Sequence, residues 1–149
     1  MLRRDYLLKL IQDLFAAIAD LLERDGDELE KQKQIEALYS EFGADKNFFR
    51  TASDAEMIAT VARVAADANG IKPDEVGVSD MCQRLELLAT LLYADYKLSD
   101  LSDGVRLDVA SRALSLFRRV DESSDSYSLD RLSKIEELAN FVKSNSCIA

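Results

Sequence analysis

The sequence predicts an all-α fold of about six helices, stacked as antiparallel hairpins or as an irregular bundle. The 149 residues include one proline and five glycines, so few helix-breaking residues interrupt the chain. Apolar side chains recur at intervals of three and four, and no stretch sustains the alternation of a strand. Because 48% of the residues are apolar, we expect a single domain over residues 1–149, with a possible bend at 70–78.

The opening stretch, MLRRDYLLKLIQDLFAAIADLL, raises three alternatives: a secretion signal, a membrane span or an amphipathic helix. Its longest apolar run covers six residues, 14–19, which is shorter than a signal peptide requires. Asp13 and Asp20 would be costly in lipid. The stretch instead predicts an amphipathic helix that ends near Arg24, because apolar side chains at helical spacing share one face: Leu7, Ile11, Leu14, Ile18 and Leu21.

The apolar face of this first helix is unusually wide, which indicates that more than one flank is buried. Two explanations stay open: it is the central helix of the bundle, or its extra flank meets a second copy of the chain. An interfacial membrane helix is a third alternative, but the polar side is mainly acidic rather than rich in Lys and Arg.

A second helix is expected over about 28–42, where Gly43 stops it. The connector after it is expected to be a short turn held by two aromatic residues, Phe48 and Phe49. Ser53 and Glu56 have the spacing of a capping box, in which each side chain bonds the other residue's backbone amide. They predict the start of a third helix, which runs to Asn69. Gly70 ends it, since glycine tolerates a left-handed conformation.

The C-terminal half predicts three more helices, over about 79–98, over about 103–120 and from residue 128 or 129 onward. The first of them repeats the wide apolar pattern of the amino-terminal helix. Polar stretches, SDLSDG and DESSDSYS, separate the three. Connections this short make the helices antiparallel neighbours.

The formal net charge is −9, and both halves of the chain are acidic. Such a surface repels a nucleic-acid backbone and an anionic membrane on average, so we expect neither as a partner. This acidic sequence nevertheless contains two pairs of neighbouring arginines, Arg3-Arg4 and Arg118-Arg119.

The residue inventory excludes several chemistries. With no histidine, the commonest general base and metal ligand is missing. Neither glycine-rich phosphate-binding motif occurs. Cys82 and Cys147 are too few for a zinc site, so we expect no metal and no cofactor. They are interpreted as free thiols of a cytoplasmic protein. Cys82 near a helix start has two interpretations: a thiol of lowered pKa or a buried structural one.

One polar residue, Asp95, interrupts an apolar face in the stretch LLYADYKL. Under one hypothesis Tyr93, Asp95 and Tyr96 line a groove that binds a peptide or a basic side chain, with Arg106 beside them. Under the other, Asp95 lies at the helix edge and forms an ion pair with a lysine or arginine, such as Arg106 or Arg112.

The segment 81–117 resembles a tetratricopeptide-type hairpin, with Leu92 and Tyr96 in its first helix and Ala113 and Phe117 in its second. Its loop is longer than that of the repeat. The opening Met-Leu-Arg-Arg-Asp-Tyr is similar to that of a family of small bacterial helical proteins of unknown function. That resemblance implies a bacterial cytoplasmic protein without a known activity.

These features predict a non-enzymatic protein-interaction or assembly module, whose partner is another protein or a second copy bound through the first helix. The alternative is a small-molecule binder or enzyme with a pocket between helices, formed by Asp95, Tyr96 and an arginine.

Overall fold

The computed structural model describes residue 13 and residues 16–20, 28–125 and 127–146. These residues form helices and the turns between them, so the predicted all-α class is confirmed. The elements in chain order are α2 (Glu28–Glu41), α3 (Lys46–Thr51), α4 (Asp54–Asn69), the 3₁₀ helix η1 (Pro73–Glu75), α5 (Val78–Leu98), α6 (Asp103–Ser123) and α7 (Leu129–Ser146).

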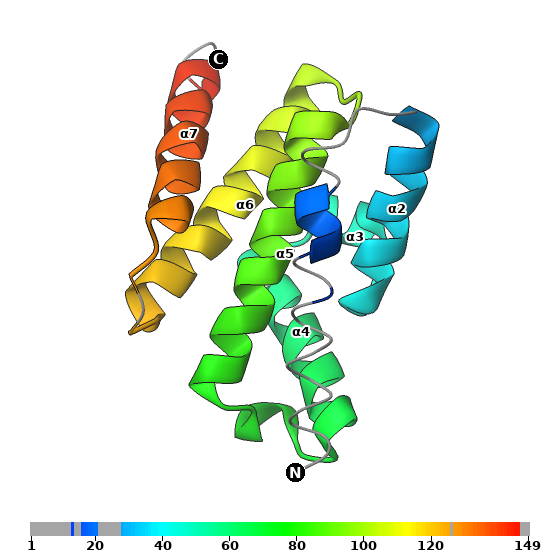
Figure 1. Ribbon diagram of the computed structural model, residues 1–149, viewed down its shortest axis with the longest axis vertical. Coiled ribbons are helices and arrows are strands. Elements are labelled where there is room, and N and C mark those ends of the chain that lie inside the picture. The colour runs from blue at the N-terminus through cyan, green and yellow to red at the C-terminus, as the bar shows by residue number, and fades with distance from the viewer. Residues whose placement is uncertain (1–12, 14–15, 21–27, 126, 147–149) are drawn as a thin grey trace.

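Helix α5 is the centre of the bundle. It packs against α6 on one side and against α2 and α4 on the other, while α7 covers the outer side of α6 (Figure 1). The chain runs along α5, back along α6 and forward again along α7, as the short connections predict. Residues 16–20, dark blue in Figure 1, lie between α5 and α2, and Ile18 is fully buried there.

The breadth of the apolar face of α5 follows from this central position. Buried side chains form an unbroken series from Leu87 to Asp95, because other helices of the same chain cover α5 on all sides. The apolar face of α5 is therefore buried without a second copy of the chain. Of the described helices, none has the length and apolar content that a membrane crossing requires.

Local capping sets the limits of α4 as the sequence predicts. The Ser53 hydroxyl accepts from the Glu56 amide at 3.2 Å, and the Glu56 carboxylate accepts from the Ser53 amide at 3.0 Å. Gly70 ends the helix with a φ of 65°, in the left-handed region where a side chain costs energy. The bend predicted at 70–78 contains the 3₁₀ helix η1, which lies between α4 and α5.

The connector after α2 differs from its prediction as a short turn, since Lys46–Thr51 form the helix α3. Asp45 caps this helix, because its carboxylate accepts from the Phe48 amide at 2.9 Å. Phe49 is buried and stacks on Tyr39 of α2, with their ring centroids 5.5 Å apart. This packing supports a six-residue helix that local propensity alone would not.

Candidate functional site

The structure places the carboxylate of Asp95 inside the protein, with no exposed surface. Arg50 of α3 forms a two-pronged ion pair with it: Nε donates to Oδ2 at 2.8 Å and Nη2 to Oδ1 at 2.7 Å. The predicted ion pair with an arginine is confirmed, whereas the two arginines named as examples, Arg106 and Arg112, and the helix-edge position are wrong. A planar guanidinium that matches both carboxylate oxygens is the strongest form of this pairing.

Two further donors complete the environment of Asp95. The Tyr39 hydroxyl of α2 donates to Oδ2 at 2.7 Å, and the hydroxyl of Ser99, the C-cap of α5, donates to Oδ1. Gln32 donates in turn to Ser99 at 2.8 Å. We call these five residues the Asp95 network. It connects α2, α3 and the end of α5 in a part of the bundle where an unpaired charge would be costly.

The Asp95 network raises the pKa values of two of its members, Arg50 and Tyr39. The hydrogen bond to Asp95 raises the pKa of Arg50, so its guanidinium stays charged. Burial, and then the negative charge of Asp95, raise the pKa of Tyr39 well above its ordinary value of 10.0. Because four donor groups already occupy the carboxylate oxygens of Asp95, its chemistry here is structural: it holds three elements together.

Alkaline unfolding tests the pKa of Tyr39. A group whose pKa is raised by folding stabilises the protein fully below its unfolded pKa, about 10, and this contribution is lost as pH rises further. We expect the Tyr39→Phe variant to lose stability less steeply above pH 10, by up to about 1.4 kcal/mol per pH unit. At pH 7 the free energy of unfolding of this variant should be about 1 kcal/mol lower, because the hydrogen bond to Asp95 is missing. Urea unfolding across this pH range measures both; equal slopes in the two proteins would contradict the assignment.

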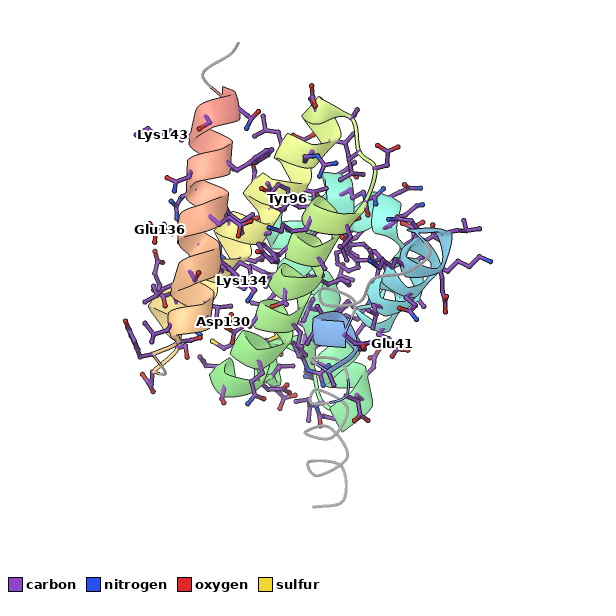
Figure 2. All side chains as sticks on the ribbon, turned by 45° about the horizontal axis from the view of Figure 1, so that its top comes forward. Glu41, Tyr96, Asp130, Lys134, Glu136 and Lys143 are labelled. Carbon is purple, nitrogen blue, oxygen red and sulfur yellow. The ribbon has the colours of Figure 1, made fainter. Side chains whose placement is uncertain are left out.

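The two tyrosines that sequence analysis grouped with Asp95 lie on another side of α5, toward α7. The Tyr93 hydroxyl donates to Glu137 at 2.8 Å, and the Tyr96 ring lies 4.8 Å from that of Phe141. The Lys97 and Lys134 ammonium groups approach the Tyr93 ring at 5.6 and 5.5 Å. Figure 2 shows Tyr96 and Lys134 between α5 and α7, whereas Glu136 and Lys143 lie on the outer side of α7. These contacts hold α7 in place.

Arg106 and Arg112 both bond the backbone rather than Asp95. The Arg106 guanidinium donates to the carbonyls of Tyr96 and Ser99, which the end of α5 leaves without helical partners. Arg112 donates to the Ala52 carbonyl at 2.7 Å and so connects α6 to the segment after α3. The four predicted binding residues therefore do not meet in one groove.

A hollow of about 560 Å³ lies elsewhere, where α5 begins, α6 ends and α7 begins. We call it the end hollow. Its charged groups are Glu86, Asp125 and Arg131, and its apolar lining includes Val78 and Val120. Arg131 is 3% exposed and donates to Glu86 and to Asp121, each at 3.1 Å. Sequence reasoning missed these residues because they come from three segments whose proximity no local pattern encodes.

Cys82 also lines the end hollow as a free, half-buried thiol. Burial raises its pKa, with the positive charge of Arg131 acting in the opposite direction. The interpretation as a thiol of lowered pKa is therefore wrong, and the structural interpretation fits.

Comparisons with protein-family models, with curated proteins and with solved structures found no match to this chain. Within the described part of the chain, no three acidic or cysteine side chains are grouped so as to hold a metal ion.

Proposed function

We propose that the chain is a non-enzymatic protein-interaction module that docks a segment of a partner protein at the end hollow. The observation that carries this proposal is the exposure of three large apolar side chains at this end of the molecule. Val78 is 68% exposed, Tyr127 is 76% exposed and Leu129 is 72% exposed. Val78 lines the hollow directly, and Tyr127 and Leu129 lie between Asp125 and Arg131, which also line it.

Exposed apolar residues beside a concavity are typical of interaction sites, whereas apolar residues scattered singly over a surface are ordinary. The other large exposed apolar residues among those described lie far apart in the chain: Leu29, Ile71 and Val105. The grouping at one end, next to a hollow, therefore favours docking there.

The charges at the end hollow indicate the chemistry of the partner. The guanidinium of Arg131 is bonded to two carboxylates, those of Glu86 and Asp121, and a third carboxylate, that of Asp125, also lines the end hollow. Asp125 has no hydrogen-bond or ion-pair partner among the described residues. We therefore propose a partner segment with a large apolar residue beside a Lys or Arg, which complements both the apolar rim and the negative charge.

Selection of peptides from a displayed random library on the immobilised full chain tests this proposal. We expect enrichment of a basic residue next to a large apolar one. For a selected peptide, Leu129→Ser and Asp125→Lys should each weaken binding about tenfold in fluorescence anisotropy.

The matched control is Val105→Ser, which changes an exposed apolar residue near the start of α6, away from the end hollow. It should leave the affinity unchanged. Enrichment of acidic peptides, or equal losses in all three variants, would contradict the proposed docking site.

The alternative function, small-molecule binding between helices, is favoured by one observation: the end hollow of about 560 Å³ is of the size that ligand pockets usually have. A metabolite that raises the melting temperature of the wild type but not of Asp125→Lys would support it.

The free thiol of Cys82 supports our proposal of a reducing, cytoplasmic location.

The homodimer through the first helix stays a prediction, because most of that helix, including Leu14, lies outside the described residues. Ile18 is 0% exposed within the single chain, so its side chain is already buried by other helices. Other side chains of the first helix would have to form the contact.

A further inference from the structure

The kind of partner segment proposed for the end hollow occurs in this chain itself, in residues 1–12, MLRRDYLLKLIQ. Large apolar residues adjoin basic ones twice here: Leu2 precedes Arg3, and Leu8 precedes Lys9. The stretch holds three basic residues and one acidic residue, although the whole chain has a net charge of −9. It lies outside the part of the chain that the structure describes. We infer that residues 1–12 of a second copy of the chain dock at the end hollow, an inference that rests on the proposed function.

The end hollow complements both properties of this segment. The carboxylate of Asp125 lines it and has no hydrogen-bond or ion-pair partner among the described residues. Val78 and Leu129 supply exposed apolar surface at its rim. A large apolar side chain such as Leu2 can cover this surface while the neighbouring Arg3 forms an ion pair with Asp125.

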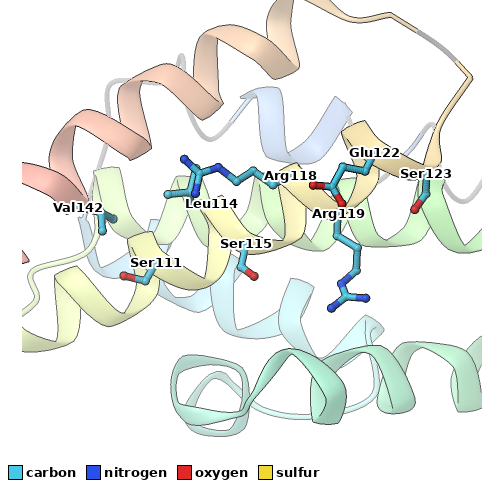
Figure 3. Close-up of a pocket in the computed structure, with 8 residues that line it drawn as sticks. All are labelled: Ser111, Leu114, Ser115, Arg118, Arg119, Glu122, Ser123 and Val142. Atoms are coloured by element: carbon cyan, nitrogen blue, oxygen red, sulfur yellow. The ribbon is translucent and has the colours of Figure 1, made fainter.

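The second pair of neighbouring arginines, Arg118-Arg119, fits the end hollow less well. It lies between Phe117 and Val120, each 1% exposed, so no large apolar side chain beside it is free to dock. Figure 3 shows that its two side chains point in different directions from α6, with the carboxylate of Glu122 between them. This pair therefore serves as a control rather than as a candidate.

A second basic residue beside an apolar one lies in the turn after α4. Ile71 and Lys72 are both exposed there. Asp74 and Glu75 follow them closely and more than offset the charge of Lys72. Residues 1–12, with their excess of basic residues, match the negative charge of the end hollow better.

The position of residues 16–20 favours docking on a second copy over docking within the same chain. Ile18 is buried between α5 and α2 (Figure 1). The end hollow lies on the other side of α5, where α6 ends and α7 begins. To reach the hollow of its own chain, the segment would have to pass around the start of α5, whereas the hollow of a second copy requires no such path. Two copies that exchange their opening segments form a closed dimer.

Sedimentation equilibrium of the full chain tests this inference. We expect a monomer–dimer equilibrium that shifts toward the monomer as salt is added, because salt screens the charges of an exposed contact. Arg3→Glu combined with Arg4→Glu should weaken the dimer roughly tenfold, and so should Asp125→Lys alone.

An equimolar mixture of these two variants gives the sharper result. Each variant by itself lacks one side of every contact. In the mixture, the unchanged opening segment of the Asp125→Lys chain can enter the unchanged hollow of the other chain, so one intact contact forms per pair. The mixture should therefore associate more tightly than either variant alone, which a general loss of stability would not produce.

The matched control is Arg118→Glu combined with Arg119→Glu. It changes the net charge as much as the double variant at residues 3 and 4, in a pair that does not line the end hollow. The dimer of this control should be as tight as that of the wild type. A chain that is monomeric at every concentration, a mixture no tighter than its components, or an equal loss in the control would overturn the inference.

A synthetic peptide of residues 1–12 separates the second copy from other partners of the end hollow. It should bind the full chain in fluorescence anisotropy and dissociate the dimer, and Asp125→Lys should weaken its binding about tenfold. If library-selected peptides bind at the end hollow and the 1–12 peptide does not, the docking site stands and the second copy is wrong as its partner. If neither kind of peptide binds, both proposals fail.

Discussion

Replacing Asp95 with alanine is expected to lower the free energy of unfolding by about 3–5 kcal/mol. The substitution removes the carboxylate that Arg50, Tyr39 and Ser99 all bond, and leaves the guanidinium of Arg50 without its partner in a largely buried position. The loss of stability comes mainly from this uncompensated charge, since removing one partner of a buried pair costs far more than the pair itself contributes. Urea unfolding at pH 7, monitored by circular dichroism, measures the effect.

Two further variants separate this explanation from a general effect of the substitution. Asp100→Ala removes an exposed carboxylate five positions further on, and it should change stability by no more than about 0.5 kcal/mol. Asp95→Leu combined with Arg50→Met removes both charges, and it should recover a large part of the lost stability. A loss below about 1 kcal/mol in Asp95→Ala would mean that the Asp95 network does not hold α2, α3 and α5 together as the distances indicate.

Gly43→Val is expected to lower the free energy of unfolding by about 2–5 kcal/mol, from two causes that add. Gly43 follows α2 with a φ of +102°, a conformation that a β-branched residue adopts only under strain. A Cβ atom at this position would lie 2.5 Å from Cγ2 of Val64 and 3.2 Å from Cγ2 of Thr60. The turn would have to move away from α4, which would also shift the α3 helix that carries Arg50.

The matched control for this variant is Gly104→Ala, in the first turn of α6. A Cβ atom there meets nothing within 4 Å, and alanine loses less backbone entropy on folding than glycine. We expect the free energy of unfolding to rise by about 0.4–1 kcal/mol, measured in the same urea titration. If Gly43→Val is as stable as the wild type, the close approach of this turn to α4 is wrong.

Local patterns in the sequence predicted the helices well, because the interactions that start and stop a helix lie within four residues of each other. The capping box of Ser53 and Glu56 and the left-handed Gly70 are both present. The missed helix α3 had one local signal, Asp45 as its N-cap. Six residues are too few to show a helical period, and the helix depends on the burial of Phe49 against Tyr39.

The candidate site was predicted only in part. An aspartate on an apolar face drew attention to Asp95 and to an arginine as its partner. Both proposed arginines were wrong, because Arg50 lies 45 positions away in the chain. The two tyrosines flanking Asp95 are on the same helix, yet they face α7 while Asp95 faces α2 and α3.

The sequence by itself determined the all-α class, the approximate helix limits and the need of Asp95, on an apolar face, for a cationic partner. Helical period and capping are local properties, and a single chain displays them directly. Only the tertiary structure decided that Arg50 neutralises Asp95, that α5 is the central helix and that the end hollow lies where α5, α6 and α7 meet. Those features depend on which helix faces meet across long sequence separations, and packing of the whole chain selects among many combinations that local patterns leave equivalent.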